Sequence, residues 1–184
     1  MPFIKTDFPG LLIFEPKVLE DTRGYFYESY NERMFFAEGI KIKFVQDNQA
    51  QSTYGVIRGL HYQLNPHAQT KLLRVLSGSI LDVAIDISKG SPAYGKVFTL
   101  ELSAENKKQL LIPKGFAHGY SVLSTTAVVF YKCDEFYHQE CDGGIAYNDT
   151  TLNINWQIPT DKTIISEKDE KHPGLNNCLN NFYF

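Results

Sequence analysis

A histidine lies between two cationic side chains in a stretch of otherwise apolar, strand-like sequence. Residues 58–63 read RGLHYQ, and Lys71 follows at the head of KLLRVLSG. An apolar core would not gather Arg58 and Lys71 around His61 without an anion to bind. Histidine supplies a base with a pKa near neutrality, and an ammonium group stabilises an enolate oxygen. These residue types indicate proton abstraction next to a carbonyl group, while a metal ligand and a structural histidine remain alternative interpretations of His61.

Charge and composition exclude several classes of partner. The 184 residues carry 18 basic and 21 acidic side chains, so a net charge of -3 offers no general attraction to nucleic acid or to an anionic membrane. Lys5, Asp7 and Pro9 interrupt the apolar run that a signal peptide requires, and no run approaches the ~18 apolar residues of a membrane span. Three cysteines without a CxxC pair indicate reduced thiols, no zinc site and a cytoplasmic location.

The elements that must position these residues are mainly short strands. Apolar and polar residues alternate in LDVAIDI (81–87) and in KVFTLELS (96–103), and two strand-like runs meet at a tight turn over residues 77–79. One short helix is expected after Asn31, with Gly39 at its end. The polar segment from about residue 160 is expected to pack on the outside. The pattern predicts a single all-β domain over residues 1–184, as a sandwich or barrel.

A turn motif narrows the fold. PKGFAH (113–118) resembles the second motif of the cupin superfamily, whose domain is a jelly roll, a double-stranded β-helix. Metal-binding cupins add a His-x-His pair and a glutamate, but Gln63 stands at the second histidine position and Lys71 at the glutamate position. A protonated lysine has no lone pair to offer a cation. We expect a cupin-type jelly roll with a few short peripheral helices and no bound metal, with a metal-dependent cupin as an alternative.

Longer stretches carry a closer resemblance. The chain resembles the dTDP-4-dehydrorhamnose 3,5-epimerase family over nearly its whole length. The matching stretches are IFEPKVLEDTRGYFYESYN, FVQDN, GVIRGLHYQ, KLLRVLSG, GSPAYGKV, LSAENKKQLLIPKGFAHG, YKC and ISEKD. The resemblance implies that His61 is the proton acceptor and that Asp169, in SEKD, orients it. It further implies that Tyr131 donates a proton to the opposite face and that Lys71 stabilises the enolate.

The resemblance also implies a set of substrate-binding residues. Arg58 and Arg23 would hold the diphosphate with Lys168 near it, and Tyr137 would stack on the thymine. The remaining residues expected to line the sugar-nucleotide site are Glu28, Gln46, Asp47, Asn48, His118 and Asp142. Family dimers share an N-terminal strand, which implies that Arg23 and Glu28 serve the neighbouring subunit of a homodimer. His67 and His172 are expected to be exposed loop residues without a role.

The implied function is a cofactor-free isomerase. It would invert C3 and C5 of a dTDP-4-keto-6-deoxy-hexose, in dTDP-L-rhamnose biosynthesis, through enolate intermediates. Inversion at one carbon only is the alternative, and a non-catalytic sugar-nucleotide binder is a third interpretation. Departures from the family pattern, in FYHQECDGGI and AYND, lie near the nucleotide end and concern base specificity more than the chemistry.

Overall fold

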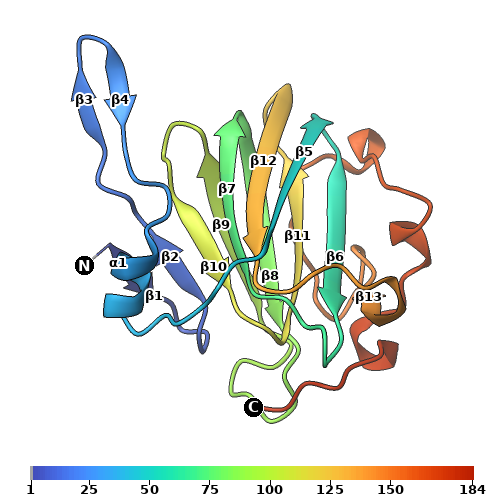
Figure 1. The fold of residues 1–184 in the computed structure, drawn as a ribbon. Coiled ribbons are helices and arrows are strands. Elements are labelled where there is room, and N and C mark those ends of the chain that lie inside the picture. Colours follow the sequence, from blue (N-terminus) through green and yellow to red (C-terminus); the bar gives the residue numbers. More distant parts are fainter. Residues whose placement is uncertain (1) are drawn as a thin grey trace.

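Two antiparallel sheets face each other in the computed structural model, which describes residues 2–184 (Figure 1). The six-stranded sheet has the order β1 (Phe3–Lys5), β2 (Leu12–Phe14), β10 (Gln109–Ile112), β7 (Lys71–Ser77), β12 (Thr126–Cys133) and β5 (Gln46–Thr53). The five-stranded sheet has the order β13 (Asp142–Gly144), β6 (Ile57–Gln63), β11 (Phe116–Val122), β8 (Ser79–Asp86) and β9 (Val97–Ser103). The predicted all-β class is confirmed.

The turn at Gly78 joins the two sheets. β7 ends at Ser77 and β8 begins at Ser79, yet β7 pairs with β10 and β12 whereas β8 pairs with β9 and β11. Gly78 has a φ of 76°, and a Cβ there would lie 2.1 Å from the carbonyl oxygen of Thr126. Only glycine fits this corner, because both the backbone conformation and the close approach exclude a side chain.

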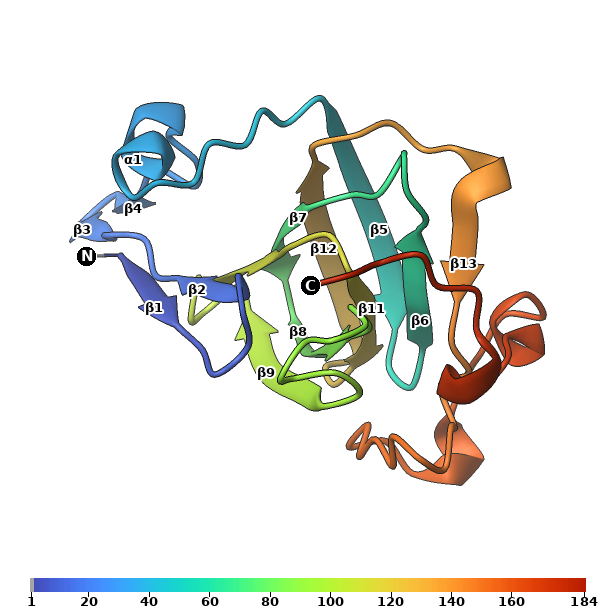
Figure 2. The same ribbon diagram turned by 90° about the horizontal axis from the view of Figure 1, so that it is seen from below.

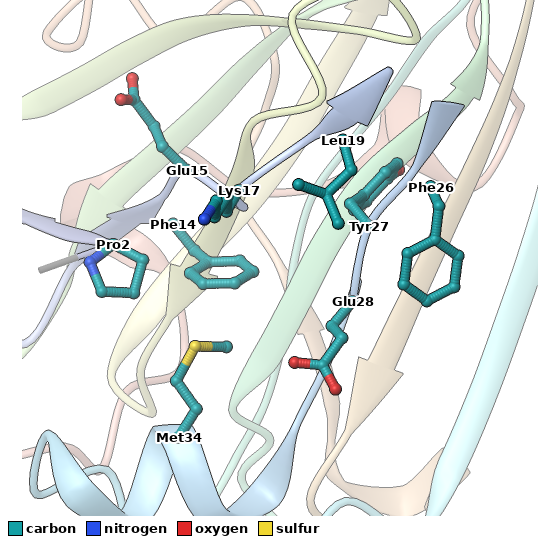
Figure 3. Close-up of a pocket in the computed structure, with 9 residues that line it drawn as sticks. All are labelled: Pro2, Phe14, Glu15, Lys17, Leu19, Phe26, Tyr27, Glu28 and Met34. Atoms are coloured by element: carbon teal, nitrogen blue, oxygen red, sulfur yellow. The ribbon is translucent and has the colours of Figure 1, made fainter. Parts of the chain in front are cut away.

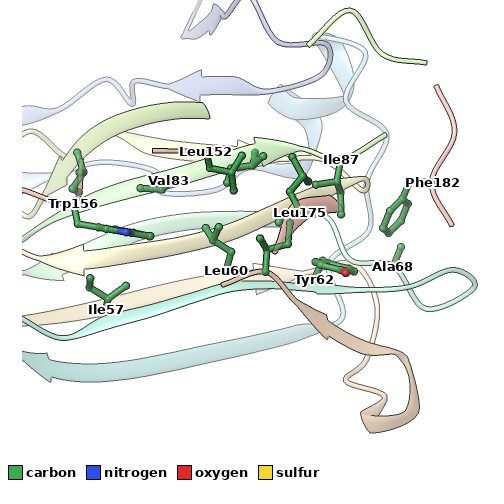
Figure 4. Packing of buried hydrophobic residues seen from close by; sticks show 14 residues of the cluster. Ile57, Leu60, Tyr62, Ala68, Val83, Ile87, Leu152, Trp156, Leu175 and Phe182 are labelled. Carbon is green, nitrogen blue, oxygen red and sulfur yellow. The ribbon is translucent and has the colours of Figure 1, made fainter. Parts of the chain in front are cut away.

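Alternation along β8 serves two apolar cores. Leu81, Val83 and Ile85 pack on the outer face of the five-stranded sheet, whereas Ile80 and Ala84 belong to the core between the sheets. Leu152, Trp156, Leu175 and Phe182, from the C-terminal segment, cover the outer core (Figure 4). That segment carries three short 3₁₀ turns, η2 (Thr160–Lys162), η3 (Asp169–Lys171) and η4 (Leu175–Asn177). It packs on the outer face of the five-stranded sheet.

The N-terminal elements lie on the side of the sandwich opposite the C-terminal segment (Figure 2). Helix α1 (Glu32–Ala37) begins where predicted, with the Asn31 Oδ1 accepting hydrogen bonds from the backbone N–H groups of Arg33 and Met34. Strands β3 (Leu19–Asp21) and β4 (Gly24–Phe26) form a hairpin that projects away from both sheets (Figure 1). Within residues 2–184, no helix combines the length and the apolar character that a membrane crossing requires.

Candidate active site

His61 and a buried carboxylate form a hydrogen-bonded pair. The His61 Nε2 lies 2.7 Å from the Asp169 Oδ1, and the side chain of Asp169 is 5% exposed while that of His61 is 33% exposed. Burial alone would raise the pKa of Asp169, but the hydrogen bond and charge of His61, with the Gly59 N–H, hold that pKa below its usual value. An ionised carboxylate only accepts, so Nε2 carries the proton and Nδ1 presents its lone pair.

Asp169 reaches His61 from outside the sheet, at a point where the strand has no side chain. It lies in η3, and its Oδ2 accepts a hydrogen bond of 3.2 Å from the backbone N–H of Gly59, on β6. A Cβ on Gly59 would lie 2.5 Å from the Cα of Gly119, so glycine is required where β6 and β11 approach each other. The outer core under the C-terminal segment holds η3 against β6.

His172 is a second histidine at this carboxylate that the sequence did not reveal. Its Nε2 is buried without a hydrogen-bond partner among the described residues and lies 3.7 Å from the Asp169 Oδ1. Burial, with the charge of His61, lowers its pKa. The prediction that His172 is an exposed loop residue is wrong, because its side chain is only 12% exposed. The loop sequence EKHPG gave no signal of this packing.

Lys71 and Tyr131 come from the other sheet. The Lys71 Nζ lies 5.9 Å from the centre of the Tyr131 ring. Burial lowers the pKa of Lys71, although the negative charges of Cys133, Asp82 and Asp142 act in the opposite direction. Burial likewise raises the pKa of Tyr131 to about 12, so its phenol keeps its proton at neutral pH.

Arg58 and His118 lie on adjacent strands of the five-stranded sheet. The Arg58 Nε donates to the Ser52 Oγ at 3.0 Å, which links β6 to β5 of the opposite sheet. His118 stands directly opposite His61 in the β6–β11 ladder, and its Nε2 lies 3.0 Å from Asp82. Asp82 is fully buried, although alternation alone had assigned it to the polar face. The polar face of β8 lies inside the sandwich, where Asp82 pairs with His118.

A cluster of polar side chains forms beside β13. The Tyr137 hydroxyl donates to the Asp142 Oδ2 at 3.3 Å, and the Lys168 Nζ donates to the same oxygen, which raises the pKa of Lys168. The backbone N–H of Tyr137 donates to the Gln46 Oε1 at 3.2 Å, and the Gln46 Nε2 donates to Asn48. Asp47 points elsewhere, because it forms an exposed ion pair with Lys132 at 2.9 Å.

Arg23 and Glu28 lie apart from the His61–Asp169 pair. The guanidinium of Arg23 is 88% exposed in the projecting hairpin and pairs with Asp21. Glu28 lines a cavity of about 600 Å³ between the hairpin and α1, beside residues such as Phe14, Phe26 and Met34 (Figure 3). The side-chain partners of these two residues are Asp21 and Asn31, and neither His61 nor Asp169 is among them.

The residues at the cupin metal position do not fit a metal ion. The Gln63 Nε2 donates to the carbonyl oxygens of His67 and Phe136, and its Oε1 accepts from the backbone N–H of His138 at 2.6 Å. Lys71 stands where a carboxylate would be needed, and the His118 Nε2 is bound to Asp82. An amide with both ends engaged and an ammonium group are not a set of metal ligands.

The two facing sheets and this dyad define a cupin-type fold equipped for proton transfer. A family model described as dTDP-4-dehydrorhamnose 3,5-epimerase matches residues 5–177. An enzyme of that name from Shigella flexneri is 52% identical over 92% of this chain and 93% of its own. The chain therefore belongs to the dTDP-4-dehydrorhamnose 3,5-epimerase family, and its predicted cupin-type jelly roll is confirmed.

Solved structures agree with this assignment. The epimerase of Elizabethkingia anophelis matches with a TM-score of 0.90 at 50% identity, covering 95% of this chain and 96% of the other. The epimerase of Legionella pneumophila, solved in complex with dTDP-4-keto-L-rhamnose, matches with a TM-score of 0.91 at 45% identity, covering 95% and 93%. The residues matched by the family model include Asp169.

Proposed function

We propose that this protein inverts C3 and C5 of dTDP-4-dehydro-6-deoxy-D-glucose to give dTDP-4-dehydro-L-rhamnose. The observation that carries the proposal is the His61–Asp169 pair at 2.7 Å, which leaves His61 Nδ1 free to take a proton. The family and the dTDP-4-keto-L-rhamnose bound to the Legionella relative support the choice of substrate. The three unpaired cysteines, Cys133, Cys141 and Cys178, suit a reducing cytoplasm.

Each inversion takes two proton transfers. His61 removes the proton from the carbon next to the C4 ketone, and the Lys71 ammonium stabilises the enolate oxygen that forms. Tyr131, protonated at neutral pH because its pKa is raised to about 12, returns a proton to the opposite face of the carbon. Asp169 holds the ring of His61 and stabilises its charged form. Only protein side chains take part in these steps.

Substrate binding uses the two ends of the cavity. In this proposal, Arg58 and Lys168 bind the diphosphate, and Tyr137 stacks on the thymine next to Asp142. The Lys168–Asp142 pair keeps the ammonium of Lys168 charged, since the hydrogen bond raises its pKa. His118, Gln46 and Asn48 complete the lining toward the sugar. Asp47 forms an ion pair with Lys132 at 2.9 Å and is given no direct contact with the substrate in this proposal.

Solvent labelling tests the reaction. In D2O, the wild-type protein is expected to place deuterium at both C3 and C5 of the 4-keto sugar nucleotide, read by NMR or mass spectrometry. Label at one carbon would select a single-centre epimerase, and label at neither would contradict the epimerase and favour a binding protein. In Tyr131→Phe, exchange without inversion is expected, because His61 can return the deuteron to the face from which it took the proton.

The substrate site is completed by a second subunit. Arg23 and Glu28 lie on the N-terminal arm, and that arm exposes the apolar side chains of Leu19, Tyr25 and Phe26, which are 54%, 59% and 66% exposed. Exposed apolar side chains grouped on a projecting hairpin are typical of an interface. In the proposed homodimer, the N-terminal strands are exchanged, so Arg23 binds the diphosphate in the partner's cavity.

Complementation between subunits checks this arrangement. Arg23→Ala and His61→Ala are each expected to be nearly inactive, but a mixed dimer has one site with neither substitution. Equal mixing after subunit exchange should therefore restore about a quarter of wild-type activity. If Arg23 serves its own subunit, every site of the mixed dimer carries a substitution and no activity returns. Light scattering coupled to size-exclusion chromatography provides the control for dimer formation.

A further inference from the structure

A second cluster of metal-ligating side chains lies beside the turn that follows β6, outside the proposed catalytic residues. Two sets of ligand atoms each lie within 4.8 Å of one another, and both include His67. The first set combines His67 with Glu135 and His138, and the second combines it with Glu140 and Cys141. Nitrogen, oxygen and sulfur ligands thus meet in one place, although the sequence predicted only an exposed loop histidine at position 67.

Gln63 holds this cluster together. Its amide nitrogen donates a hydrogen bond of 2.7 Å to the carbonyl oxygen of His67, and its amide oxygen accepts one of 2.6 Å from the backbone N–H of His138. The carbonyl oxygen of Cys141 accepts a hydrogen bond of 2.8 Å from the N–H of Leu64. These hydrogen bonds fix the backbone on both sides of the cluster, so the ligands are organised before any ion arrives.

His67, like His172, has a buried ring nitrogen that needs a partner. Its Nδ1 is buried and makes no hydrogen bond with any residue in 2–184. Its ring stacks on that of His138 with the centres 3.5 Å apart and the planes 13° from parallel. The His138 Nδ1 in turn lies 3.1 Å from the Glu140 Oε1. A buried imidazole nitrogen without a partner is costly, and an ion bound there would remove the cost.

We propose that His67, Glu140 and Cys141 bind one divalent transition-metal ion of the Zn²⁺ class. Imidazole and thiolate are ligands that Zn²⁺ prefers, whereas Mg²⁺ and Ca²⁺ require sets made of oxygen. Binding converts the Cys141 thiol to a thiolate and releases its proton to solvent. The site is separate from the epimerase chemistry and does not depend on that proposal.

The other histidine cluster, around Asp169, is a weaker candidate. His61, Asp169 and His172 also place ligand atoms within 4.8 Å. An ion there would have to displace the 2.7 Å hydrogen bond between His61 and Asp169, and it would compete with the Gly59 N–H for the same carboxylate. Its ligands contain no sulfur, so the two clusters are distinguishable by spectroscopy.

Cobalt titration of the full chain, under reducing conditions, tests the proposal. Co²⁺ is expected to bind one ion per chain, with d–d bands of tetrahedral intensity and a thiolate-to-metal charge-transfer band, and Zn²⁺ should displace it. Cys141→Ser should abolish the charge-transfer band, and His67→Gln should weaken binding by about 100-fold or more, since even outer partners of a metal site are worth 10–100-fold. Cys178→Ser is the matched thiol control, and His172→Gln removes the other cluster.

The outcomes separate clearly. A charge-transfer band that survives Cys178→Ser and His172→Gln but is lost in Cys141→Ser supports the site. Loss of Co²⁺ binding in His172→Gln, with no effect of Cys141→Ser or His67→Gln, would move the ion to Asp169 and overturn the proposal. Absence of stoichiometric Co²⁺ and Zn²⁺ binding to the folded wild-type protein would overturn it too. Circular dichroism of each variant confirms that the fold is retained.

Discussion

Replacing the proposed base, in His61→Asn, is expected to lower kcat by about 10²-fold or more, the size usual for loss of a general base. Asparagine can still form hydrogen bonds at this position but offers no basic nitrogen. Binding of dTDP should change little, because His61 is proposed to act on the reacting sugar and not on the nucleotide. Rates of deuterium incorporation at C3 and C5, measured beside turnover, would show whether proton abstraction itself is the step that is lost.

A folded His61→Asn variant is needed for this comparison. Its melting temperature should remain near that of the wild type, since His61 is one-third exposed and lies outside the three apolar clusters. Retention of dTDP binding by calorimetry is the second control. Undiminished turnover in a folded variant would contradict the assignment of His61 as the base and leave the fold unaffected.

Asp169→Asn is expected to lower kcat by about 10²-fold or more, because it would change the tautomer of His61. The amide can donate to Nε2, which would move the imidazole proton to Nδ1, the nitrogen proposed to act as the base. KM should change less than kcat, because the carboxylate does not meet the substrate. The double variant His61→Asn/Asp169→Asn should lose little beyond the single His61→Asn, since residues that act as a unit are not additive. Full additivity would contradict the dyad.

Asp169 also links activity to stability. Its pKa in the folded protein is below the value of a free carboxyl, so its ionised form stabilises the fold above the unfolded pKa of ~3.9 and that contribution is lost as the pH falls through the folded value. At neutral pH, Asp169→Asn should therefore be less stable than the wild type in urea unfolding, and the difference should shrink in acid. Asp169→Glu, which keeps the charge, should recover part of both properties.

Periodicity predicted the strands well because it depends on local burial. β8, β9 and the Asn31 cap of α1 appear where alternation and capping chemistry indicated. Alternation does not say which sheet a strand joins, so the separation of β7 from β8 at Gly78 could not be read from the sequence. The inward direction of Asp82 was missed for the same reason, since a polar face can line a cavity as well as meet solvent.

The site was harder to predict than the fold. The stretch RGLHYQ indicated a functional site, because cationic side chains around a histidine in an apolar strand require an explanation. Asp169 lies in the run SEKDEK, which looks like a solvated charge cluster, and only packing of the C-terminal segment buries it. Without the family resemblance, no local signal would have selected it. His67 and His172 were dismissed as loop residues because burial of a loop is a tertiary property.

The carboxylate that orients His61 comes from a different layer of the protein than the surfaces assigned to the substrate. Asp169 lies in η3 of the C-terminal segment and accepts a hydrogen bond from the Gly59 N–H, while the sugar nucleotide is proposed to bind between the sheets. The strength of the base and the shape of the proposed substrate-binding region therefore depend on different segments of the chain. Substitutions in the C-terminal segment can change the basicity of His61 without changing the residues proposed to bind the sugar.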